Sequence, residues 1–80
     1  MKRFLLHNHH EADECGVTFA AFKGHPSPLR RQETASSCLT GGHEVWWFVD
    51  AETAEAALAL LPSYVAERST AIPIRTVLIP

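Results

Sequence analysis

The sequence predicts one α+β domain over residues 1–80, with elements in the order strand, helix, strand, strand, helix, strand. Two observations carry this prediction. Apolar residues alternate along the N-terminal segment and then recur at helical spacing, so the period changes early in the chain. Near the middle, a glycine pair precedes five β-branched or aromatic residues, Val45 to Val49, which is typical of a hairpin that leads into a buried strand.

The first strand is predicted over Lys2 to His9. Its period of two places Phe4, Leu6, Asn8 and His10 on one face and Arg3, Leu5, His7 and His9 on the other. A helix is predicted over Glu11 to Lys23, because Cys15, Phe19 and Phe22 recur at helical spacing. Gly24 is expected to end it, since glycine accepts the left-handed conformation.

The next segment, His25 to Glu33, is predicted as a loop because Pro26 and Pro28 prevent regular pairing. The simplest interpretation of Arg30 and Arg31 is that they are solvated loop charges; anion binding is the alternative.

The hairpin spans residues 34–50, and we expect a two-residue turn at Gly41-Gly42. That turn pairs Thr40 with His43 and Cys38 with Val45. One face then carries Cys38, Thr40, His43, Val45, Trp47 and Val49, and the other carries Leu39, Glu44, Trp46 and Phe48.

A second helix is predicted over Ala51 to Arg68, with Thr53 as its N-cap and a kink or two short helices at Pro62. Its apolar stripe consists of Ala54, Ala57, Leu58, Leu61 and Val65. The last strand is predicted over Ile72 to Ile79, and Pro73 near its start indicates an edge strand.

Composition excludes several classes of function. The net charge of −2 gives no basic surface for nucleic acid, and no apolar run approaches membrane-spanning length. Two cysteines without a secretory signal predict free thiols in a reducing cytoplasm. A domain of 80 residues is marginally stable, so metal binding or oligomerisation is expected to add stability.

This order of elements is that of the ferredoxin-like βαββαβ fold, a four-stranded antiparallel sheet in the order 4-1-3-2 with two helices on one face. Both faces of the predicted sheet carry large apolar residues, yet the helices can cover only one. A bare face with Leu5, Trp46 and Phe48 is a large apolar patch of the kind that monomers avoid. We therefore predict a homodimer that packs sheet against sheet through the other face.

The chain resembles the small dimeric α+β-barrel superfamily in its element order, its glycine-turned hairpin, its Asp50-Ala51-Glu52 strand end, its alanine-rich helix and its closing Val77-Leu78-Ile79-Pro80. That superfamily includes muconolactone isomerase, the YciI-like proteins, antibiotic-biosynthesis monooxygenases and small nickel-binding actinobacterial proteins. The resemblance implies a ligand pocket between sheet and helices or within the barrel.

The predicted topology gathers imidazoles and thiols at one end of the sheet, where they suit zinc, nickel or copper. The candidate metal ligands are His7, His9, His10, Cys38 and His43. Cys15 lies in the same half of the domain, but its place on the apolar stripe favours a buried core residue. Binding of a transition metal or small ligand at this His-rich end is the favoured function.

Two alternatives remain open. The first is a cofactor-free isomerase or monooxygenase with His7 or His9 as general acid or base and Glu44 in support. Its ligand pocket would be lined by Trp46, Trp47, Phe48 and Phe22. The second is a non-catalytic interaction module.

Overall fold

The computed structural model describes all residues, 1–80, and its centre is a four-stranded antiparallel sheet in the order β2-β3-β1-β4. Strand β1 (Lys2–His9) is central, and strand β3 (Glu44–Ala51) pairs with it along its whole length. Strand β4 (Ser69–Ile74) lies on the other side of β1, and β2 (Ala35–Ser36) is a two-residue edge. The strand order and directions are those expected from the sequence.

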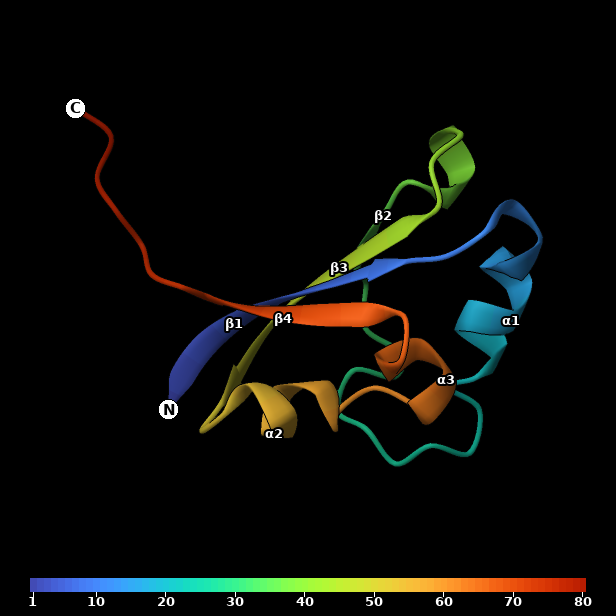
Figure 1. Cartoon of the computed structure of the whole chain (residues 1–80), viewed down its shortest axis with the longest axis horizontal. Coiled ribbons are helices and arrows are strands. Elements are labelled where there is room, and N and C mark those ends of the chain that lie inside the picture. Colours follow the sequence, from blue (N-terminus) through green and yellow to red (C-terminus); the bar gives the residue numbers. More distant parts are fainter.

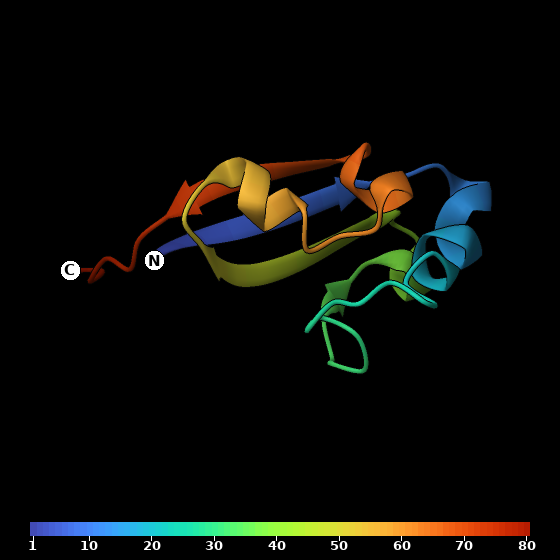
Figure 2. The same ribbon diagram turned by 90° about the horizontal axis from the view of Figure 1, so that it is seen from below.

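The helices differ from the expectation, and the predicted ferredoxin-like fold with two helices packed on one face is therefore wrong. The first helical segment consists of a 3-10 turn, η1 (Ala12–Glu14), and the six-residue α1 (Cys15–Ala20). Figures 1 and 2 show α1 beyond the end of β1 rather than across the sheet. The local sequence explains the short helix, because glycine and two β-branched residues, Gly16 to Thr18, are poor helix formers.

The second helical segment is divided at Pro62, as predicted, into α2 (Ala54–Leu58) and α3 (Ser63–Ala66). The hydroxyl of Thr53 caps α2 by accepting a hydrogen bond from the Ala56 N–H at 3.1 Å. Both helices lie on the same side of the sheet (Figure 2). Their apolar residues and one face of the strands form a core of Phe4, Leu6, Val45, Trp47, Val49, Ala51, Ala57, Leu61 and Val65.

The predicted two-residue hairpin is also wrong. A 3-10 turn, η2 (Cys38–Thr40), stands between β2 and β3, and Ser36 rather than Cys38 pairs with Val45. Both glycines serve this longer connection. Gly41 ends η2 with a φ of 93°, and a Cβ at Gly42 would lie 2.3 Å from the Ser37 hydroxyl oxygen. Cys38 therefore lies in a loop and not on a strand.

Strand β4 is an edge strand, as predicted, but it begins and ends earlier than the expected range of residues 72–79. Its last residue, Ile74, pairs with Arg3 of β1. Residues 75–80 extend away from the sheet (Figure 1).

One face of the sheet carries no helix. Cross-strand pairing places Leu5 beside Phe48 and Ile72 on this face, and the side chains of Phe48 and Ile72 are 61% and 42% exposed. The structure thus has the bare apolar face that motivated the homodimer, while the homodimer itself stays a prediction. No helix has the length and apolar character needed to cross a membrane.

Candidate metal centre

Four imidazole and thiol side chains meet beyond the end of the sheet. The backbone N–H of His10 donates to the His43 carbonyl at 2.9 Å, so this contact continues the β1–β3 ladder past the last paired residues. Cys15 begins α1 and Cys38 begins η2, which brings one thiol to each side of the ladder's end. Residues from three separate segments of the chain therefore converge at one place.

The donor atoms of these residues lie within contact distance. Nε2 of His10 is 3.1 Å from Sγ of Cys38 and 3.3 Å from Sγ of Cys15. The donor atoms of these three residues all lie within 4.8 Å of one another. Nδ1 of His43 is 3.3 Å from Sγ of Cys15. His10 is buried, and the other three side chains are partly buried. The cluster thus offers two sulfur and two nitrogen donors.

A buried asparagine orients the His10 ring. The Nδ2 group of Asn8 faces two backbone carbonyl oxygens, those of Val65 and Arg68, each at 3.4 Å. Carbonyl oxygens only accept hydrogen bonds, so the amide nitrogen must lie on that side and Oδ1 must face His10. The His10 Nδ1–H then donates to Asn8 Oδ1 at 2.7 Å. This leaves the Nε2 lone pair of neutral His10 directed at the two thiols, as in metal sites with a second-shell partner.

The surroundings favour the neutral forms of His10 and Cys15 when no cation is bound. Burial is the main cause that lowers the pKa of His10 below its ordinary value of 6.5, and nearby His43 lowers it further. A hydrogen bond with the Cys38 thiol, followed by burial, raises the pKa of Cys15. Both cysteines are free, as predicted. A thiophilic cation would displace the thiol protons and find an imidazole already in its neutral, ligating form.

A separate polar contact ties the start of α1 to α3. The Tyr64 hydroxyl donates to the Glu14 carboxylate, and Arg68 Nε lies 3.3 Å from the same carboxylate oxygen. The Tyr64 hydrogen bond is the main cause that lowers the pKa of Glu14. The Arg68 guanidinium also stacks over the Tyr64 ring at 3.8 Å. The residue immediately before Cys15 is therefore anchored, which helps to place the Cys15 thiol.

The structure brings together only part of the predicted ligand set. His10, Cys38 and His43 join the cluster, whereas His7 and His9 belong to the opposite face by strand alternation. Nε2 of His7 lies 2.6 Å from Glu44 Oε1. The His7 ring stacks on Trp46, with ring centroids 5.6 Å apart.

His9 is exposed at the end of β1. The proposed catalytic roles of His7, His9 and Glu44 stay predictions. Trp46, Trp47 and Phe48 line one shallow pocket of about 350 Å³ at the β2 edge of the sheet.

Two residues of the site were not assigned to it from the sequence. Cys15 was interpreted as a core residue because it shares a helical stripe with Phe19 and Phe22. Asn8 drew no functional interpretation, although a signal was available. It is an amide on the apolar face of a strand, two residues after Leu6 and two before His10. Such a buried amide requires a partner, and one partner here is the His10 imidazole of the cluster.

Comparison with protein-family models, curated proteins and solved structures finds no match for this chain. The resemblance to the dimeric α+β-barrel superfamily stays a prediction, and a function for this chain has to come from the geometry of its own residues.

Proposed function

We propose that this chain is a zinc-binding domain whose ion is held by His10, Cys15, Cys38 and His43. The observation that carries the proposal is the convergence of the His10, Cys15 and Cys38 donor atoms with a second-shell amide already in place. A set of two thiolates and two imidazoles is typical of structural zinc sites, and such a set suits nickel and copper less well when its arrangement is tetrahedral.

The spacing of the donor atoms supports this choice of ion. With Zn–S near 2.3 Å and Zn–N near 2.0–2.1 Å, sulfur and nitrogen ligands of a tetrahedral ion lie about 3.6 Å apart. The observed sulfur–nitrogen distances are 3.1 Å and 3.3 Å, so the donors need to move apart by only a few tenths of an ångström. Only the donors of His10, Cys15 and Cys38 all lie within 4.8 Å of one another, so the His43 ring must also move toward the other ligands to complete the tetrahedral set.

The ion would act as a structural cross-link. Without it, α1 is a six-residue helix of weak intrinsic propensity beyond the end of the sheet. Only 13 of the 80 residues are buried, so the apolar core alone gives a small domain limited stability. An ion that binds the end of β1, the start of α1 and the η2 loop joins three segments that the core does not hold together.

The proposal is tested by metal analysis of untagged protein that is purified without a nickel column. We expect one zinc per chain, and loss of this zinc in Cys38→Ser and Cys15→Ser. His7→Ala and His9→Ala are matched controls, because they remove imidazoles at the same end of β1 but on the other face. Circular dichroism of each variant separates loss of the ligand from loss of the fold.

Three results would contradict the proposal. Protein that takes up no metal from zinc-containing buffer would refute the site, and zinc that persists in a folded Cys38→Ser variant would refute the ligand set. Uptake of nickel or copper with rejection of zinc would overturn the choice of ion.

A further inference from the structure

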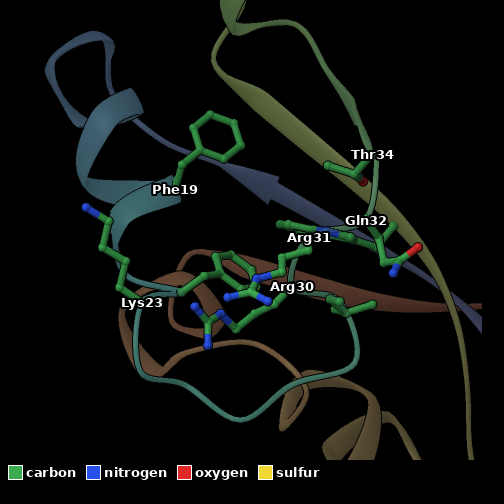
Figure 3. Close-up of a pocket in the computed structure, with 9 residues that line it drawn as sticks. Phe19, Lys23, Arg30, Arg31, Gln32 and Thr34 are labelled. Atoms are coloured by element: carbon green, nitrogen blue, oxygen red, sulfur yellow. The ribbon is translucent and has the colours of Figure 1, made fainter.

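A second site lies on the other side of α1, in a pocket of about 260 Å³ between this helix and the loop 29–34 (Figure 3). Phe19, Phe22 and Lys23 form the wall on the helix side, and Leu29 to Gln32 form the opposite wall. Trp47 of β3 also lines the pocket. None of these residues belongs to the candidate metal centre, so the pocket requires its own explanation.

The floor of the pocket is aromatic and apolar. The rings of Phe22 and Trp47 pack against each other with centroids 5.9 Å apart and an interplanar angle of 42°. Phe19, which is 42% exposed, and Leu29 continue this surface toward solvent. A dry apolar cavity of about 150 Å³ is enough to bind benzene, so a pocket of 260 Å³ has room for a ring system with a head group.

The rim of the pocket is cationic. Lys23, Arg30 and Arg31 line it, and no acidic residue does. In Figure 3 the Arg30 and Arg31 side chains extend from their loop toward α1, while the Lys23 side chain, on the opposite wall, points away from them. The ion pairs of the chain involve other cations: the N-terminus, His7 and Arg68.

The positive charge of this pocket contrasts with the net negative charge of the whole chain. The chain has seven Lys and Arg against nine Asp and Glu, yet three of the seven cations line one pocket that no carboxylate lines. Glu33, the nearest acidic residue in the sequence, lines the adjoining shallow pocket instead. Like charges that line one pocket repel each other, and an anion bound between the two arginines relieves the repulsion.

The backbone adds a further sign of a built site. Arg31 has a φ of 64°, the only positive φ outside glycine in the chain. This left-handed conformation costs a β-carbon-bearing residue about 1 kcal/mol or more, and strained residues of this kind collect at ligand sites. Glycine or asparagine would adopt this positive φ at a lower free-energy cost than arginine, so solubility alone does not explain an arginine at this position.

We propose that this pocket binds a small aromatic carboxylate, with its ring between Phe19, Phe22 and Trp47 and its carboxylate between Arg30 and Arg31. Guanidinium groups suit a carboxylate because they donate two parallel hydrogen bonds to it. The aromatic floor supplies the apolar contact area and the edge-to-face partners for the ring. The two proposed sites share no residue, so the pocket can be tested whether or not the chain binds zinc.

The test uses 2-naphthoate as the probe, followed by 15N NMR of the full-length chain as purified. We expect chemical-shift changes at residues 19–23 and 29–34 and at the Trp47 indole N–H. The neutral isostere 2-naphthamide should bind about tenfold more weakly or worse, as should 2-naphthoate to an Arg30→Gln/Arg31→Gln variant, because each change removes a charge-assisted contact. A Lys2→Gln/Arg75→Gln variant, which loses the same charge outside the pocket, should bind 2-naphthoate as the unsubstituted chain does.

The outcomes separate specific binding from simpler explanations. Equal affinity for 2-naphthoate and 2-naphthamide would mean that the probe binds only through apolar contacts, and it would overturn the proposal. Shifts centred on Leu5 and Phe48 would place the probe on the bare sheet face and would also overturn it. Inorganic phosphate that competes at equal affinity would mean an anion site without an aromatic part. Unchanged binding in the double-arginine variant would remove the proposed role of the rim.

Discussion

Replacing Asn8 with leucine tests the metal centre without touching a ligand. Both side chains have four heavy atoms and branch at Cγ, so leucine, although larger, has the shape of the fully buried Asn8 side chain. The Val65 carbonyl still accepts hydrogen bonds from the Ser69 hydroxyl at 2.6 Å and from the Arg68 N–H at 3.0 Å. The only group that loses its partner is therefore the His10 Nδ1–H.

The magnitude follows from that single orphaned donor. A buried polar group without a partner costs about 1–3 kcal/mol, which in a domain of this size corresponds to a fall in Tm of about 4–8 °C for each kcal/mol. The metal-free protein should lose this stability. Zinc affinity should fall about 10–100-fold, because the ring of His10 is no longer held in the ligating tautomer and orientation. The stoichiometry should remain one zinc per chain, since every ligand is still present.

The matched variant is Asn8→Asp. Its carboxylate accepts the His10 Nδ1–H as the amide does, so zinc affinity should stay within about tenfold of the original. Its second oxygen has no proton for the Val65 and Arg68 carbonyls, so metal-free stability should fall. Competition with a chromophoric chelator measures the affinity, and urea titration measures the stability. Unchanged zinc affinity in Asn8→Leu, or equal losses in both variants, would refute the role of Asn8 in orienting the His10 ring.

Three further predictions concern the fold. Leu6→Ala should destabilise the chain by about 2–5 kcal/mol in urea, because Leu6 is fully buried, whereas Leu39→Ala, at a fully exposed side chain, should stay within about 0.5 kcal/mol. Thr53→Ala should cost about 1 kcal/mol, since the N–H of Ala56 loses its cap. The predicted homodimer would cover the bare sheet face, so Phe48→Lys should give a monomer mass by light scattering. A monomer mass for the unsubstituted chain at micromolar concentration would disprove the dimer.

The strands could be predicted because their pattern is local. Alternation along β1 and the aromatic run in β3 identify both strands and their buried faces, and the core contains Phe4, Leu6, Val45, Trp47 and Val49. The β2–β3 connection could not be predicted in the same way. A glycine pair is equally compatible with a tight turn and with the end of a 3-10 turn, and only the contact of Gly42 with Ser37 decides between them.

The site was partly predictable for a related reason. Topology alone brings His10, Cys38 and His43 to one end of the sheet, and the structure places them there. His7 was assigned to the same site because residues two apart on a strand share a face with each other, but His10 lies on the opposite face. The role of Cys15 depends on how α1 leaves the end of β1. That direction is set by tertiary contacts such as the one between Glu14 and Tyr64, which no sequence spacing records.

The short helix α1 connects the two proposed sites physically. Its first residue, Cys15, is a proposed zinc ligand, and Phe19, one turn later, lines the pocket proposed to bind a carboxylate. Because Gly16 and its neighbours give α1 little intrinsic stability, zinc binding should order the helix and with it one wall of the pocket. Linkage then requires that zinc raise the affinity for the carboxylate and that the carboxylate raise the affinity for zinc by the same factor. Titrations of 2-naphthoate with and without zinc, and of zinc with and without 2-naphthoate, measure both factors. If neither ligand changes the affinity for the other, α1 is ordered without either ligand and the two sites act separately.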